Sequence, residues 1–141
     1  MLGESLLKRI LEALREVEPQ LVLLHGSYAR GDFLEGVSDV DLLVVSERFR
    51  GVPIGERISL LAYALRRITP PVEAVGYTLD ELLERIEGLD PYVLAAVEEG
   101  VVVLDEGVYP RVREKYLEVK RRYKLRRIEG GWTWEAGADR T

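Results

Sequence analysis

The chain has 141 residues, no cysteine, one histidine and a formal net charge of −5. This length suits one ordinary domain with its own core. The lack of cysteine excludes disulfides and thiolate metal sites, and a single histidine argues against zinc. Neither an apolar run of membrane-spanning length nor a charged-then-apolar leader appears, so we expect a cytoplasmic protein without a membrane partner.

Hydrophobic periodicity predicts alternating helices and strands. In chain order the predicted elements are a helix over 4–18, a strand over 21–24, a helical turn over 27–31, a strand over 40–45, a helix over 56–68, a strand over 72–77, helices over 79–87 and 91–100, a strand over 101–104 and a helix over 109–126. Thr78 with Glu81 forms a predicted capping box, and Asp90 before Pro91 is a second predicted helix cap. The strand over 40–45 is almost entirely apolar, which is typical of a central strand.

Two motifs flank the loop between the first two strands. The first strand breaks at Gly26-Ser27, and the second begins at Asp39-Val40-Asp41. Because side chains alternate along a strand, Asp39 and Asp41 share one face, roughly 7 Å apart. Paired carboxylates suit Mg²⁺, and a second ion about 3.5–4 Å away would complete a clamp for in-line displacement.

The residues after the first strand suit an anion. Gly26 has no Cβ to block a ligand, Ser27 opens a predicted helical turn, and Arg30 lies on the same side. Taken alone, a Gly-Ser pair is usually a turn and an isolated D-x-D is usually solvated polarity. His25, directly before Gly26, is better explained by packing or hydrogen bonding than by catalysis.

Together the motifs are far more specific. G-S-x-x-R-G over 26–31 and S-D-x-D over 38–41, followed by Leu-Leu-Val-Val, resemble the nucleotidyltransferase superfamily of DNA polymerase β, and above all its minimal nucleotidyltransferases. The resemblance covers about residues 1–80 and is sharp over 25–45. We expect an α/β (α+β) fold with a small mixed sheet of three to four strands and helices mainly on one face.

The resemblance also implies a role for each motif residue. Asp39 and Asp41 hold the metals, two Mg²⁺ ions, while Gly26, Ser27, Arg30 and Ser38 bind the nucleotide. Glu73 occupies the place of a third catalytic and metal-binding carboxylate. An acid within an apolar strand is costly without a charged partner. The alternative is a solvent-facing Glu on an edge strand.

The C-terminal segment is basic. Nine Lys or Arg stand against Glu114 and Glu118 over 108–127. This helix could dock on its own acidic fold, on an acidic partner protein or on nucleic acid. We expect a nucleotidyltransferase domain over 1–107, with the basic helix and a tail containing Trp132 and Trp134, 108–141, packed on it; a freely flexible tail is the alternative.

The implied function is Mg²⁺-dependent transfer of a nucleoside monophosphate, AMP from ATP, to an acceptor hydroxyl. Minimal nucleotidyltransferases are commonly paired, as antitoxins, with small helical proteins of the HEPN type, so the resemblance implies such a partner. Nothing in the chain resembles a separate base-recognition domain or a long nucleic-acid channel, so we do not expect a nucleic-acid partner. A non-catalytic subunit that masks a partner, or a transferase for a small molecule or RNA, remains an alternative. The sequence leaves open the nucleotide, the acceptor and any homo- or hetero-oligomer.

Overall fold

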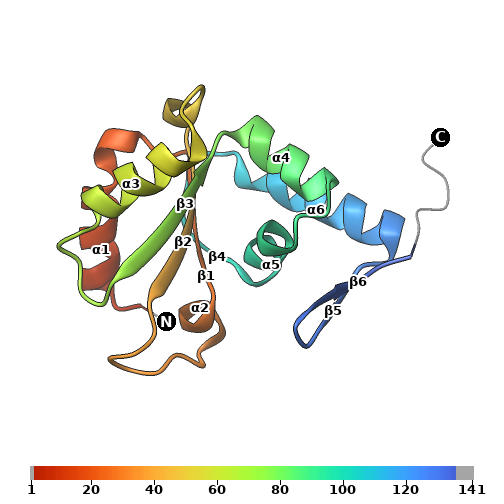
Figure 1. Cartoon of the computed structure of the whole chain (residues 1–141), viewed down its shortest axis with the longest axis horizontal. Coiled ribbons are helices and arrows are strands. Elements are labelled where there is room, and N and C mark those ends of the chain that lie inside the picture. Colours follow the sequence, from red (N-terminus) through yellow and green to blue (C-terminus); the bar gives the residue numbers. More distant parts are fainter. Residues whose placement is uncertain (1, 136–141) are drawn as a thin grey trace.

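The structure is a computed structural model that describes residues 2–135. Its centre is a mixed sheet in the spatial order β3 (Val72–Tyr77), β2 (Val40–Val45), β1 (Leu21–His25) and β4 (Val101–Asp105) (Figure 1). Strand β1 is antiparallel to both neighbours, whereas β2 and β3 are parallel. The predicted mixed α/β sheet and the internal position of β2 are therefore confirmed.

Helices and short turns connect these strands. They are α1 (Glu4–Ala13), a 3₁₀ turn (Arg15–Val17), α2 (Ser27–Arg30), a 3₁₀ turn (Glu47–Phe49), α3 (Ile54–Ala64), α4 (Leu79–Glu87), α5 (Pro91–Glu99) and α6 (Tyr109–Tyr123). A separate hairpin of β5 (Arg126–Ile128) and β6 (Gly131–Thr133) follows α6. Both predicted caps are present, because Thr78 and Glu81 form a capping box and Asp90 accepts hydrogen bonds from the first turn of α5.

Helices cover both faces of the sheet. Leu21, Leu23 and Leu43 pack with buried residues of α4, α5 and α6, whereas the alternate side chains of the same strands pack with α1 and α3. Figure 1 shows these two helical groups on opposite sides of the sheet. The expectation of helices mainly on one face is corrected, because strands that are apolar at every position require cover on each side.

Three helices have different ends from those predicted. Helix α1 stops at Ala13, and the apolar pattern continues through a 3₁₀ turn before Glu18 adopts a left-handed conformation. Helix α3 runs from Ile54, directly after Pro53, to Ala64, so it begins two residues before the predicted start and ends four residues before the predicted end. Helix α6 ends at Tyr123, where Lys124 has φ +51° and the chain enters β5. Periodicity alone does not separate a helix from a 3₁₀ turn of the same spacing.

The apolar face of α6 packs on the protein's own core. Val112, Tyr116, Val119 and Tyr123 belong to the cluster beneath α4 and α5. Lys115 and Arg122 both bond to the Glu87 carboxylate. The basic helix thus satisfies part of its charge within the fold.

The described part of the tail after α6 packs on the same domain. Trp132 packs against the α6 cluster, whereas Trp134 is half-exposed. Residues 136–141 of the predicted tail lie outside the described residues. Within residues 2–135, no helix has both the length and the apolar character needed to span a bilayer.

Candidate active site

Gly26 brings the end of β1 against a carboxylate of β2. Its φ is +74° and its ψ −157°, a conformation that only glycine adopts readily. A Cβ at this position would lie 2.2 Å from Oδ2 of Asp41. The sequence therefore needs glycine here for two reasons, and the Gly26 backbone lies directly beside the first candidate metal ligand.

Three predicted carboxylates lie on one face of the sheet. Asp41 of β2 is in register with Glu73 of β3, and Asp39 immediately precedes β2 with the same alternation. Neighbouring strands are about 4.8 Å apart, so such side chains can share a ligand. Burial, and then the negative charges of Glu73 and Asp39, raise the pKa of Asp41 above its ordinary value.

The donor set suits a hard divalent cation. The three groups offer oxygen ligands only, and a cation would relieve the repulsion that raises the pKa of Asp41. Over residues 2–135, no three acidic or histidine side chains already converge on one point. Mg²⁺ usually takes one or two carboxylates and completes its shell with water and phosphate, so Asp39 and Asp41 fit this role without a closed cage.

Glu73 is both a solvent-facing residue of an edge strand and a neighbour of the paired aspartates. It is exposed on β3, which forms an edge of the sheet. It also lies directly beside Asp41 and contributes to the raised pKa of that group. Its part in the chemistry remains a proposal that rests on this register.

Arg30 and the Gly26 amide are held by other carboxylates. The Arg30 Nε donates to Asp32 at 3.2 Å, and its Nη1 donates to both oxygens of Glu99, at 3.1 and 3.2 Å. The Gly26 N–H donates to Glu99 Oε1 at 2.9 Å. Asp32 and then Glu99 raise the pKa of Arg30, while the positive charge of Arg30 partly offsets the rise in the pKa of Asp41.

The two serines play different local parts. Ser27 is the first residue of α2, and its carbonyl accepts from the N–H groups of Gly31 and Asp32. Ser38 Oγ accepts from the Leu34 N–H at 2.8 Å, which closes the loop before β2. Ser38 therefore shapes the approach to Asp39, and nucleotide contact by either serine remains a prediction.

His25 is buried and paired with an aromatic residue of α5. Its Nε2 lies 3.1 Å from the Tyr92 hydroxyl, and the rings meet edge to face with centroids 5.2 Å apart. Burial lowers the pKa of His25, so the ring is neutral at pH 7. Burial and then the Asp41 charge raise the pKa of Tyr92. His25 thus has the packing and hydrogen-bonding role expected of it, and Tyr92 lies near the carboxylates.

Sequence reasoning missed Glu99 and Tyr92. One signal was available for Glu99, because Glu98 and Glu99 end a helix at the terminus where the backbone dipole disfavours negative charge. Two acids at this terminus are stabilised by nearby cations, and Arg30 forms an ion pair with Glu99 there. Tyr92 gave no signal, since its contact with His25 joins positions 67 residues apart.

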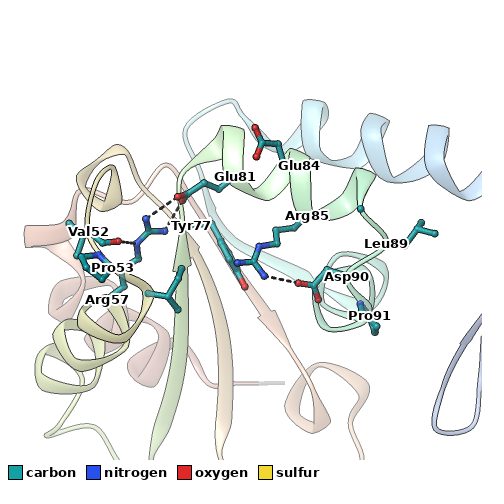
Figure 2. Close-up of a pocket in the computed structure, with 12 residues that line it drawn as sticks. Val52, Pro53, Arg57, Tyr77, Glu81, Glu84, Arg85, Leu89, Asp90 and Pro91 are labelled. Carbon is teal, nitrogen blue, oxygen red and sulfur yellow. Dashed lines mark hydrogen bonds and ion pairs between the residues drawn. The ribbon is translucent and has the colours of Figure 1, made fainter. Parts of the chain in front are cut away.

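A cleft of about 820 Å³ lies at the other end of β3, between α3 and α4–α5 (Figure 2). Arg57 binds Glu81 at one side and Arg85 binds Asp90 at the other, while Tyr77 projects from β3 between them. None of the predicted site residues lines it. We propose that the chemistry lies at Asp39, Asp41 and Glu73, because two of the acids of the cleft, Glu81 and Asp90, are already paired with arginines.

A mixed sheet that carries a Gly-Ser turn beside paired aspartates is the arrangement that the resemblance to nucleotidyltransferases predicts. Comparison with known protein families agrees with this expectation. The family described as "Nucleotidyltransferase domain" matches residues 7–130 of the chain. The chain belongs to this nucleotidyltransferase domain family. The match reaches well beyond residue 80, so α4, α5 and α6 are part of it.

Three solved structures resemble this chain at low sequence identity. A toxin–antitoxin structure with AMP-PNP has 19% identity over 82% of this chain and 84% of that chain, with a TM-score of 0.50. A mutant of the toxin–antitoxin pair MntA-HpeT has 17% identity over the same shares, with a TM-score of 0.49. A Sulfolobus solfataricus protein, provisionally described as a nucleotidyltransferase, has 21% identity over 70% and 78%, with a TM-score of 0.45. Among curated proteins, none matches this chain.

Proposed function

We propose that this nucleotidyltransferase moves AMP from Mg²⁺-bound ATP to a hydroxyl of a small helical protein of the HEPN type, and thereby acts as an antitoxin. The observation that carries the proposal is the register of Asp41 with Glu73, beside Asp39 and the Gly26 backbone. Carboxylates gathered at a backbone that a ligand can approach closely serve phosphoryl chemistry, whereas a purely masking surface has no use for them.

Each residue has a part in this reaction. Gly26, Ser27 and Arg30 hold the triphosphate, with Ser38 shaping the loop beside it. The acceptor oxygen attacks the α-phosphorus in line, its proton passes to Glu73, and pyrophosphate leaves. Bound at Asp39 and Asp41, Mg²⁺ would offset the charge that develops on the phosphate oxygens. The AMP is thereby joined to the acceptor oxygen.

The choice of a protein acceptor rests on the open side of the site. Glu73 is exposed on an edge strand, so a large acceptor can reach it without crossing the core. The toxin–antitoxin neighbour with AMP-PNP makes ATP and a partner protein the first pair to test. A masking subunit without catalysis is the competing function.

The test is to incubate the protein with a HEPN-type partner and Mg²⁺-ATP and to weigh both chains by mass spectrometry. We expect the partner to gain about 329 Da, one AMP, because acceptor and α-phosphate are held in line only in the complex. Asp39→Ala and Asp41→Asn should abolish the gain, while Glu56→Gln, an exposed acid on α3, should keep it. A complex that forms equally with wild type and Asp39→Ala, and shows no gain, would favour the masking function.

A further inference from the structure

The Glu99 carboxylate binds the groups that we assign to the phosphates of the nucleotide. The Gly26 N–H and both Arg30 contacts described above end on its carboxylate, and Arg127 Nη1 of β5 lies 3.8 Å from its Oε2. Its side chain is only 15% exposed. Two of the groups that we assign to the triphosphate, the Gly26 N–H and Arg30, thus both bind one carboxylate.

The backbone of Glu99 is held in place by the packing of helix α5. Helix α5 buries Val93, Leu94, Ala96 and Val97 against the sheet. Gly100 follows as the C-cap of the helix, where a Cβ would lie 2.3 Å from the Ala96 carbonyl oxygen. Glu99 can therefore leave the Gly26 N–H by rotating its side chain, without movement of the helix.

Asp32 already supplies what Arg30 needs for its orientation. It accepts from the Nε, near the stem of the guanidinium, whereas Glu99 takes the outer Nη1. A residue that only positioned Arg30 would also have no reason to accept the Gly26 N–H. The pattern is that of an anion in the ligand's place.

We propose that Glu99 competes with the nucleotide for the same protein groups. Its carboxylate accepts the Gly26 N–H and pairs with Arg30 in the free protein, and the triphosphate displaces it. This inference rests on the proposed function, because it assigns those groups to phosphate. A polyphosphate carries several negative charges and acceptor oxygens, so it outcompetes one carboxylate, whereas weak single anions do not. Glu99 thereby sets nucleotide affinity and favours polyphosphate over monophosphate.

The test compares Glu99→Gln with Asp32→Asn, which removes the other carboxylate on the same guanidinium. Calorimetry with inorganic tripolyphosphate and with Mg²⁺-ATP should show roughly fivefold or greater tightening for Glu99→Gln, the effect of losing one charged competitor. Asp32→Asn should stay within about twofold of wild type, because the Asp32 side chain is 62% exposed and its charge is screened by solvent. The Gly26 amide resonance should shift on tripolyphosphate addition in both proteins.

Three results would overturn the inference: equal affinities for wild type and Glu99→Gln, weaker binding by Glu99→Gln, or the same tightening in Asp32→Asn. If AMP transfer occurs but the affinities are equal, the proposed function stands and the role of Glu99 falls. If tripolyphosphate binds as expected but AMP is never transferred, the role of Glu99 stands and the proposed function falls. If neither anion binds wild type or variant, both fall.

Discussion

At the scale of single residues, Gly26 carries the strictest requirement of the site. Its backbone conformation excludes other residues, and its missing Cβ makes room for the Asp41 carboxylate. A glycine that is required only for its positive φ would have room for a Cβ. The structure provides such a glycine at Gly31, which has φ +85° and no atom within 4 Å of the point that a Cβ would occupy.

We predict that Gly26→Ala disrupts both stability and metal-dependent nucleotide binding. The unfavourable φ and the 2.2 Å approach to Asp41 should together cost about 2–4 kcal/mol of unfolding free energy. Gly31→Ala should cost about 1–2 kcal/mol from strain alone and leave Mg²⁺-ATP affinity unchanged. Urea denaturation and calorimetry measure the two effects. Equal nucleotide affinity for Gly26→Ala and wild type would contradict this arrangement.

At the scale of elements, a buried arginine joins α3 to the start of α4. The Arg57 side chain is 4% exposed and bonds to both Glu81 oxygens, at 2.7 and 2.9 Å. It also donates to the carbonyls of Val52 and Gly76. The hydrogen bonds and charge of Arg57, together with the hydrogen bonds of the Thr78 capping box, lower the pKa of Glu81 from 4.5 to about 2.

We predict that Glu81 links stability to acid pH. Its folded pKa is depressed, so its contribution is complete above about pH 4.5 and is lost as pH falls toward about 2. Glu81→Gln should flatten this dependence, whereas Glu84→Gln, exposed on the same helix, should keep it. Denaturation across this pH range is the measurement.

The same variant should be less stable at pH 7. Removing the charge leaves Arg57 buried without an anion, at a cost of about 1–3 kcal/mol, below that of a fully buried pair because Glu81 is 38% exposed. If Glu81→Gln instead matches wild type at every pH, the pair contributes nothing to the fold.

The basic helix α6 leads to a different expectation. Lys115 and Arg122 are bound to Glu87, and the apolar face is buried, so much of the helix is committed to the fold. We predict little RNA binding at physiological salt, and no change when Arg121, Arg122 and Lys124 are replaced. Filter binding across a salt series checks this. Tight binding that weakens by roughly one logarithmic unit of slope per phosphate, and that is lost in the triple variant, would contradict it.

At the scale of the whole molecule, the sequence was informative wherever a local pattern decided the structure. The apolar run over 40–45 predicted β2, the capping residues predicted the starts of α4 and α5, and G-S with D-x-D predicted the family. Helix ends were less accessible, since apolar spacing continues through the 3₁₀ turn after α1. The cover of both sheet faces followed from packing across the whole chain, which no local window contains.

The site likewise contains contacts that a local pattern predicts and contacts that it does not. Gly26 and Asp41 are near in sequence and were predicted together, because one strand pair brings them face to face. Glu99 reaches the Gly26 amide across 73 positions, and Tyr92 reaches His25 across 67. Such contacts depend on how α5 crosses β1, and residue patterns along the chain do not encode that crossing.

This difference in sequence separation has a consequence for the order of assembly. The β1–β2 pair closes a short loop, so the Gly26 turn and Asp41 can meet early in folding, whereas the Glu99 contact requires a much longer closure. A contact made late lies on the native side of the folding barrier. Loss of the Glu99 carboxylate should then leave the folding rate unchanged and alter the rate of unfolding. Beyond its proposed role in nucleotide affinity, Glu99 would therefore also affect the lifetime of the folded site.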